Sequence, residues 1–158
     1  MDIAHTKDGK TFTCEEECQE LKCHLKNVAN YSKEFASFFD GGEAGEVIGL
    51  LHDAGKYQAN FQDRIRGKNI RVDHATAGAK ILVEKYNAYG DLYGMAVAGH
   101  HTGLSDSGSV ASMGDGSYHA KLNNYDGSFD FIITCTELIA DELKNKNIKV
   151  DKPLNYIV

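Results

Sequence analysis

The chain has 158 residues, of which 42% are hydrophobic and 25% charged, and its formal net charge is −6. That length is typical of one globular domain with its own core, and the acidic balance excludes a protein that binds nucleic acid over its whole surface. The sequence has no apolar run near the roughly 20 residues that span a bilayer and no secretory signal. We therefore expect a cytoplasmic protein without membrane contact.

The cysteines form no recognisable metal-binding pattern, because none of them stands in a Cys-x-x-Cys pair. We expect reduced thiols in a cytoplasmic protein, with a cysteine metal site as the minor alternative. The cysteines are Cys14, Cys18, Cys23 and Cys135.

A long first helix is predicted after an extended lead-in over residues 1–12. Thr13 and Glu16 fit a capping box that opens a helix, and the helix is expected to reach Phe39 and to end at the glycine pair that follows. Its apolar side chains recur at near-helical spacing, which predicts a buried stripe. The stripe consists of Leu21, Leu25, Val28, Ala29, Phe35 and Phe39.

The rest of the chain also shows helical patterns separated by short breaks. A segment rich in Gly, Ser and Asp over residues 102–117 predicts a loop, and the tail over 145–158 has no clear period. No repeat or linker interrupts the chain, so the sequence predicts one domain over residues 1–158. Its expected fold class is all-α, a compact helical bundle with further helices over residues 43–54, 56–66, 73–88, 92–101 and 129–144.

Five histidines and one aspartate fall at helix ends or in apolar stretches, where a helical bundle can aim them at one interior cleft. Neutral imidazole favours transition metals, and a carboxylate can bridge two ions. Neighbouring residues on a helix point about 100° apart, so a His-Asp pair can approach metal from two sides. These candidate ligands are His24, His52, Asp53, His74, His100 and His101.

Lys56 follows His52 by one helical turn and shares its face, where its charge could offset charge that builds on a phosphate. A lone histidine in a helical protein is more often an ordinary core or surface residue than a ligand. We interpret His5 and His119 in this way. The spaced combination of the other five histidines with Asp53 favours a metal site over incidental placement.

Three segments carry a resemblance to a known family. LLHDAGKYQANFQDRIRG, RVDHATAGA and AGHHTGL resemble the nuclease domain of the CRISPR-associated type I helicase–nuclease, which is part of the HD superfamily. The opening IAHTKDGK and the later GLSDSGS resemble its subtype I-C-like members. The resemblance covers residues 3–125, and the three main segments are specific when they occur together in this order.

The resemblance implies a role for each candidate ligand. It identifies His24 as the first ligand and His52 and Asp53 as the signature pair, with Asp53 bridging two divalent ions, such as Mn, Fe, Ni, Co or Mg. His74 matches the third histidine position, and His100 with His101 completes the second metal site. Lys56 matches a lysine beside the scissile phosphate, so the resemblance implies that Asp53 and Lys56 are catalytic.

One departure concerns the first metal site, which the family closes with an aspartate in a later helix. Asp141 has suitable neighbours, but it stands two positions from Ile139 and therefore lies nearly opposite the apolar face of its helix. Asp126 and Asp130 are no better supported. We expect the chain to end ahead of that helix, as a truncated or degenerate copy.

The implied function is metal-dependent cleavage of single-stranded DNA in type I CRISPR interference, an antiviral defence. The implied partners are single-stranded DNA, a helicase domain or subunit, and the CRISPR surveillance complex. Two alternatives stay open: an HD phosphohydrolase acting on small nucleotides, and a truncated HD domain that binds metal without turnover. A pure scaffold with incidental histidines is disfavoured.

A basic stretch lies between two of the site segments and includes the aromatic residues Tyr57 and Phe61. Basic side chains with interleaved aromatics are typical of proteins that bind single strands. The alternative is that Phe61 belongs to the core and the basic side chains form a solvated face. The candidate DNA contacts are Arg64, Arg66, Lys68 and Arg71.

Overall fold

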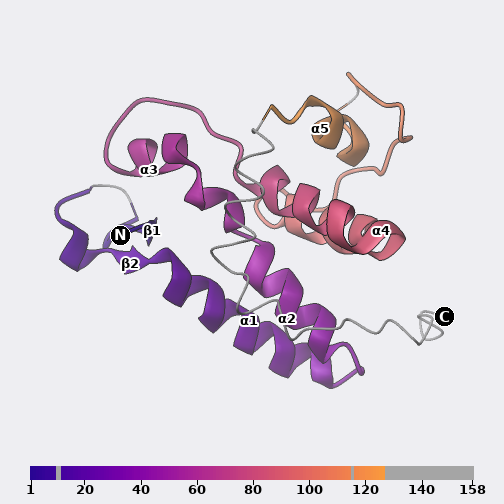
Figure 1. The fold of residues 1–158 in the computed structure, drawn as a ribbon, viewed down its shortest axis with the longest axis horizontal. Helices are drawn as coiled ribbons and strands as arrows, with labels where there is room; N and C mark the ends of the chain where they lie inside the picture. Colours follow the sequence, from indigo (N-terminus) through magenta and orange to yellow (C-terminus); the bar gives the residue numbers. More distant parts are fainter. Residues whose placement is uncertain (10–11, 115, 127–158) are drawn as a thin grey trace.

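The computed structural model describes residues 1–9, 12–114 and 116–126 (Figure 1). The regular secondary structure of its described part is helical apart from one small antiparallel sheet, which confirms the predicted all-α class. Within it, no helix is both long and apolar enough to cross a bilayer. The elements are β1 (Ile3–His5), η1 (Glu15–Glu17), β2 (Gln19–Glu20), α1 (Leu21–Ser37), α2 (Gly42–Leu51), η2 (Ala54–Tyr57), α3 (Ala59–Ile65), α4 (Ala75–Gly99) and α5 (Tyr118–Asn124).

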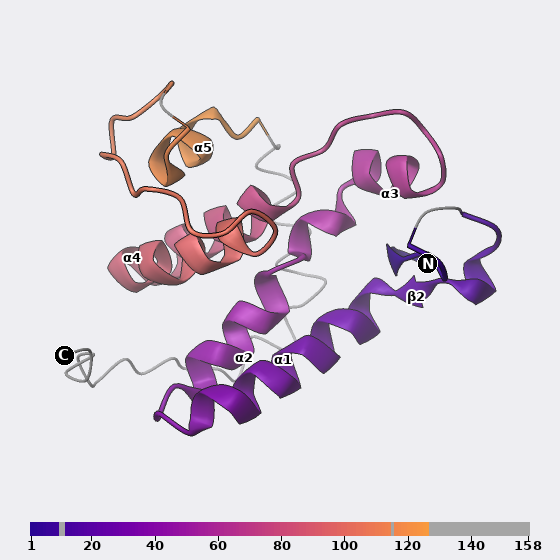
Figure 2. The ribbon, with the colours of Figure 1, turned by 180° about the vertical axis from the view of Figure 1, so that it is seen from behind.

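Helices α1 and α2 form a tightly packed hairpin, and Figure 2 shows them side by side from the opposite direction. Small residues let the two backbones approach closely. A Cβ built on Gly49 would lie 2.6 Å from Cα of Ala29, and one built on Gly45 would lie 2.7 Å from Cβ of Ala36. The hairpin buries Leu25 and Leu51, and the approach of Gly49 to Ala29 places the last turn of α2 against the first half of α1.

Helix α4 doubles back on itself. A straight helix of its 25 residues would span about 37 Å, yet the ring centroids of His74 and His100, which flank its two ends, lie 5.9 Å apart. A Cβ on Gly90 would lie 2.0 Å from the carbonyl oxygen of Leu82, so the chain reverses between these two residues and requires glycine at the close approach. The reversal brings both ends of α4 to the end of α2.

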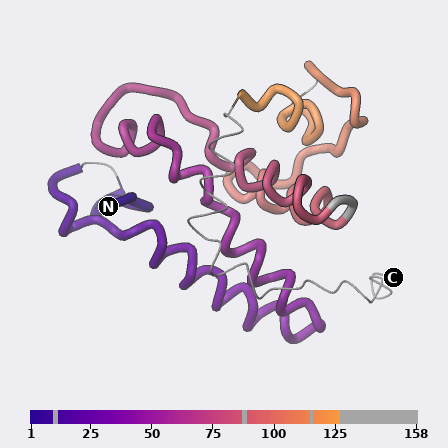
Figure 3. The backbone as a smooth tube through the Cα atoms, in the orientation of Figure 1, coloured from indigo at the N-terminus to yellow at the C-terminus, as the bar shows by residue number. Residues whose placement is uncertain are grey.

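The predicted helices over 73–88 and 92–101 correspond to the two runs of α4 on either side of this reversal, although helical hydrogen bonding continues from Ala75 to Gly99. The predicted helix over 56–66 divides into η2 and α3, and Figure 3 follows the long connection from α3 back to α4. The loop over 102–117 is confirmed where it is described, but α5 was not predicted. Ser117 caps α5 by accepting a hydrogen bond from the amide of Ala120 at 3.3 Å.

The predicted start of the first helix is wrong. Helix α1 begins at Leu21 rather than at Thr13, because residues 15–17 form the separate 3₁₀ turn η1 and the chain then pairs with β1. The Thr13 hydroxyl donates to Glu17 at 2.8 Å instead of capping a helix. The predicted helix over 129–144 lies outside the described residues.

The predicted apolar stripe of α1 is correct only in its first half. Leu21, Leu25 and Ala29 are buried, whereas Phe35 and Phe39 are 67% and 74% exposed. The far half of α1 contacts α2 through small residues such as Ala36, and the Phe35 side chain of that half is left exposed. The prediction that Phe35 and Phe39 are buried is therefore wrong.

Candidate metal centre

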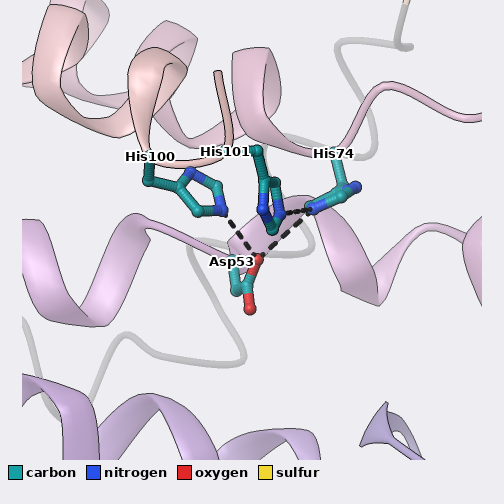
Figure 4. Close-up of side chains that lie close together, drawn as sticks. All are labelled: Asp53, His74, His100 and His101. Carbon is teal, nitrogen blue, oxygen red and sulfur yellow. Dashed lines mark hydrogen bonds and ion pairs between the residues drawn. The ribbon is translucent and has the colours of Figure 1, made fainter. Parts of the chain in front are cut away.

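The structure brings all of the predicted ligands to one place, where the ends of α2 and α4 meet the first turn of α1. His52 and Asp53 directly follow α2, and His24 projects from α1 beside them. His74 precedes α4 and His100 follows it, so the reversal of α4 joins these two residues in space (Figure 4). The helical hairpins therefore create the cluster from residues up to 77 positions apart in the chain.

Asp53 is 2% exposed and offers one carboxylate oxygen to each half of the cluster. Its Oδ2 lies 3.2 Å from Nε2 of His24 and 3.2 Å from Nε2 of His52. Its Oδ1 lies 3.3 Å from Nε2 of His100 and 3.5 Å from Nε2 of His74 (Figure 4). The two oxygens thus face two different groups of imidazoles.

The distances between these donor atoms suit atoms that share a metal ion. Metal–nitrogen and metal–oxygen bonds of about 2.0–2.2 Å, set at tetrahedral or octahedral angles, separate the ligand atoms by roughly 3.0–3.5 Å. The Nε2 atoms of His24 and His52 are 3.2 Å apart, and those of His74 and His101 are 2.9 Å apart. The donors of Asp53, His74, His100 and His101 all lie within 4.8 Å of one another.

Two of the imidazoles are oriented by backbone carbonyls in the way that metal ligands usually are. Nδ1 of His52 lies 2.8 Å from the carbonyl oxygen of Gly49, and Nδ1 of His100 lies 2.6 Å from that of Val97. A carbonyl oxygen can only accept, so each Nδ1 carries a proton and donates it. In the neutral ring, Nε2 then keeps its lone pair and points it toward Asp53.

The charges of the cluster also favour metal binding. Burial raises the pKa of Asp53, but the neighbouring imidazoles of His100, His24 and His52 outweigh that effect and hold it well below its usual range. Burial lowers the pKa of His74 to about 4, so this imidazole is neutral at neutral pH. The cluster therefore combines an ionised carboxylate with an imidazole ready to ligate.

Two buried polar atoms in the cluster lack the partners that buried polar atoms normally have. Oδ1 of Asp53 accepts no hydrogen bond, and Nδ1 of His74 has none either, within the residues that the structure describes. An unsatisfied acceptor on a buried side chain is explained if it binds a cation. The donor set and this orphaned oxygen fit a divalent metal ion.

Two glycines of the HDAGK and DHATAGA segments have a packing role. A Cβ on Gly55 would lie 2.1 Å from the carbonyl oxygen of His74, and one on Gly78 would lie 2.0 Å from that of Leu51. The backbone of the His74 segment therefore sits directly against the His52–Asp53 segment. These glycines set the distance between the two halves of the ligand set.

Asp73 fixes the start of α4. Its carboxylate accepts from the Thr76 amide at 3.0 Å and from the Thr76 hydroxyl at 2.6 Å, while its carbonyl accepts from the side chain of Gln58 at 3.1 Å. These bonds hold the residue before His74 at both its side chain and its backbone. The DH pair thus supplies one positioning residue and one candidate ligand.

Lys56 lies inside the cluster, not at its rim. Its side chain is 4% exposed, and its Nζ lies 2.8 Å from Oδ2 of Asp53 and donates to the carbonyl oxygen of Ala4 at 3.1 Å. This arrangement pairs Lys56 with the carboxylate. A contact of Lys56 with a scissile phosphate stays a prediction.

His5 also reaches the cluster, although we interpreted it as an ordinary core or surface residue. Its ring lies 4.9 Å from that of His24, and its Nε2 lies 3.4 Å from Nζ of Lys56. Sequence reasoning missed it because its place beside His24 depends on the pairing of β1 with β2. The signal that could have found it was its place in IAHTKDGK, one of the segments that carry the family resemblance.

The candidate DNA contacts differ in whether their side chains already bind other residues of the chain. Arg66 donates to the carboxylate of Glu15 and to the carbonyl oxygen of Met1, both at 2.8 Å, so it fastens the N-terminus. Lys68 pairs with Asp63 at 2.8 Å. Phe61 is 6% exposed, which confirms the core alternative for this side chain. The exposed side chains Arg64 and Arg71 remain the clearer candidates.

The remaining sequence candidates do not join the cluster within the described residues. Cys14, Cys18 and Cys23 are free thiols, and the described groups able to hold a metal contain histidine and aspartate alone. Asp126 is exposed and lies outside both of these groups. Asp130, Cys135 and Asp141 fall outside the described residues. His119 lies 4.0 Å from Asp91 and is likewise absent from both groups.

A comparison with family models gives one result that agrees with this geometry. The HD domain model matches residues 21–130, which is more than half of the chain and contains all six predicted ligands. Comparison with curated proteins finds no match. HD domains are typically metal-dependent phosphohydrolases, in keeping with the grouping of histidines around Asp53. On its matched range and its ligand set, this chain belongs to the HD domain family.

Proposed function

We propose that the chain is a nuclease that uses two divalent ions to hydrolyse phosphodiester bonds in single-stranded DNA. The observation that supports this most strongly is the division of Asp53 between two imidazole groups, with one carboxylate oxygen facing each. A bridging carboxylate of this kind is what a two-metal hydrolytic site requires. The ions themselves would be a transition metal such as Mn, Fe, Ni or Co, or else Mg.

In this proposal the bound ions supply an activated water and charge stabilisation for the phosphoryl group. The residues of the chain position that chemistry. Asp53 shares its two oxygens between the sites, and the Nδ1 donations of His52 and His100 fix the direction of their Nε2 lone pairs. Lys56 keeps a positive charge beside Asp53, where it would also reduce the repulsion met by an incoming phosphate.

The choice of single-stranded DNA rests on the family resemblance and on the exposed basic side chains of the connection between α3 and α4. Arg64 and Arg71 are exposed, and Arg71 stands three residues before the candidate ligand His74. Basic side chains that follow a strand's backbone toward a reactive centre are the usual arrangement for single-strand binding. With an acidic chain overall, this contact is local.

The same resemblance supports the proposed setting, which is type I CRISPR interference. A helicase domain or subunit and a surveillance complex would supply the displaced strand in the cytoplasm. Because the net charge of −6 disfavours strong binding of free DNA, delivery of the strand by such partners is consistent with a weak intrinsic affinity of this domain.

One observation favours a second candidate, an HD phosphohydrolase acting on small nucleotides. A cavity of about 330 Å³ opens beside Asp73, next to the candidate ligand His74, and is bordered by Lys121 and Asn124 of the α5 region. That volume is at the lower end of the range typical of small-molecule sites. The lysine and the asparagine could bind a phosphate and a base.

A substrate panel separates the two candidates. Metal-free protein would be supplied with Mn²⁺ and offered circular single-stranded DNA, the matching duplex, deoxynucleoside triphosphates and cyclic nucleotides. The proposal predicts breakage of the circular single strand with little action on the duplex or the nucleotides. Hydrolysis of a free nucleotide with intact circular DNA would replace the nuclease by the second candidate. Metal bound without turnover of any substrate would support the inactive alternative.

A further inference from the structure

The two sides of Asp53 differ in the number of donors that join them. On the Oδ1 side three imidazoles complete a group of four donors, whereas on the Oδ2 side His24 and His52 are joined to the carboxylate by the distances already given. Three protein donors can hold a catalytic ion, but a further ligand position is then open. On the Oδ2 side, strand β1 brings the donor atom of His5 to within 4.8 Å of the donors of His24 and Asp53.

We propose that His5 is a further ligand of the ion on the Oδ2 side of Asp53. Its ligand nitrogen and the donor atoms of His24 and Asp53 all lie within 4.8 Å of one another. Its ring meets that of His24 edge to face at 4.9 Å between centroids. The inference rests on the metal centre of the proposed function and does not depend on which phosphodiester is cleaved.

The strand that carries His5 is fixed to the metal centre by buried hydrogen bonds. The side chain of Gln62 accepts from the amide of Ile3 at 2.9 Å and donates to its carbonyl at 3.0 Å. The same side chain donates to the carbonyl of Lys56 at 2.7 Å. Ile3 and Ala4 are 0% and 1% exposed. A buried Gln62 therefore ties β1 to the segment that follows Asp53, so His5 is held in place.

An irregularity in the sheet directs the His5 side chain. Ile3 pairs with Glu20 and His5 pairs with Gln19, so β1 has one more residue than β2 between the two pairs. An extra residue in one strand re-aims the side chains beside it, and such bulges are common next to active sites. Here β2 leads directly into α1, the helix of His24. The bulge thus turns His5 toward the first turn of α1.

The polarity of the His5 contact leaves a lone pair at the site. Nε2 of His5 lies 3.4 Å from the ammonium of Lys56. An ammonium group can only donate, so Nε2 accepts and carries no proton in this arrangement. A small reorientation of the His5 side chain would direct that lone pair to a metal ion instead of to Lys56. The nearby charge of Lys56 should make the Oδ2-side ion the weaker of the two.

Equilibrium dialysis of the full chain against Co²⁺, with bound metal counted by mass spectrometry and the visible Co²⁺ spectrum recorded, tests the proposal without an activity assay. Wild type should bind two ions in two steps. His5→Ala should keep the tighter ion and weaken the second by more than tenfold, since loss of even an outer-shell partner costs about 10–100-fold. The Co²⁺ absorption bands that the second ion contributes in wild type should be absent from the spectrum of His5→Ala. The retained first ion shows that the variant is folded.

His119→Ala is the matched control, because His119 lies outside both metal-binding groups; it should bind two ions as wild type does. Asp130→Ala and Asp141→Ala should also keep the second ion. Two ions bound by His5→Ala with wild-type affinities would overturn the proposal, as would loss of the second ion in an aspartate variant with His5→Ala unaffected. A failure of DNA cleavage alone would affect the proposed substrate and leave this ligand assignment intact.

Discussion

The ammonium of Lys56 lies 2.8 Å from Oδ2 of Asp53, and both side chains are almost fully buried, at 4% and 3% exposure. A buried cation inside a metal centre has two consequences. It neutralises the carboxylate when no metal is bound, and it competes for the same oxygen with an ion on that side. Stability and metal affinity are therefore coupled through this pair.

Lys56→Met should destabilise the metal-free protein by about 3–5 kcal/mol, because it leaves a buried carboxylate without its cation. With Mn²⁺ bound the loss should be smaller, since the ion takes over the neutralisation of Asp53. Urea unfolding with chelator and with Mn²⁺ measures both values. Lys68→Met is the control: it removes an exposed pair with Asp63 and should change the free energy of unfolding by less than about 1 kcal/mol. Equal losses with and without metal would contradict this coupling.

Gly55→Ala should weaken both the fold and the metal centre. The added Cβ would lie 2.1 Å from the carbonyl oxygen of His74, so the backbone of a candidate ligand must move. We expect a loss of about 1–3 kcal/mol in unfolding free energy, together with weaker Co²⁺ binding. Gly114→Ala is the control, because a Cβ there meets no atom within 4 Å. Wild-type Co²⁺ affinity in Gly55→Ala would show that the spacing of the two segments is unimportant.

The metal-free protein should lose stability as the pH falls from about 6.5 to about 4. Burial lowers the pKa of His74 from 6.5 to about 4, so in this window the unfolded chain binds a proton that the folded chain does not. Burial also lowers the pKa of His5 and His101, which adds to the effect. Burial lowers the pKa of His100, but its contacts with Asp53 and with the carbonyl of Val97 together outweigh burial and raise that pKa, so His100 acts in the opposite direction.

Thermal unfolding of chelated protein at a series of pH values measures this dependence. His74→Gln should flatten the profile between pH 6.5 and 4, because the replaced side chain no longer titrates. A wild-type melting temperature that rises as the pH falls from 6.5 to 4 would contradict the predicted loss of stability.

Arg64→Glu and Arg71→Glu should each weaken binding of single-stranded DNA and reduce its salt dependence. Loss of one phosphate contact lowers the slope of log affinity against log salt by about 0.7 for a single strand. Arg66 is a poor test, since it also holds Glu15 and Met1. Lys85→Glu makes the same charge change near the reversal of α4, and its slope should stay close to that of wild type. Equal slopes in all three variants would exclude a local DNA contact.

The sequence predicted which side chains the structure brings together better than it predicted the local structure. The ligand set could be predicted because the three segments that contain most of these residues are specific when they occur together in this order. The exposure of Phe35 could not be predicted, because helical periodicity shows which side chains share a face but not what covers that face. His5 was missed for a related reason: its place depends on a strand pairing and on Gln62, a side chain 57 positions away.

The most direct test of the account is breakage of circular single-stranded DNA by metal-free protein with and without added Mn²⁺, run beside Asp53→Ala. Wild type should cleave the circle only with added metal and the variant should not cleave it, because the two proposed ions would share the Asp53 carboxylate. The variant should also bind far less Mn²⁺ than wild type. Wild-type cleavage by Asp53→Ala, or cleavage that persists in excess chelator, would contradict the central role given to this residue.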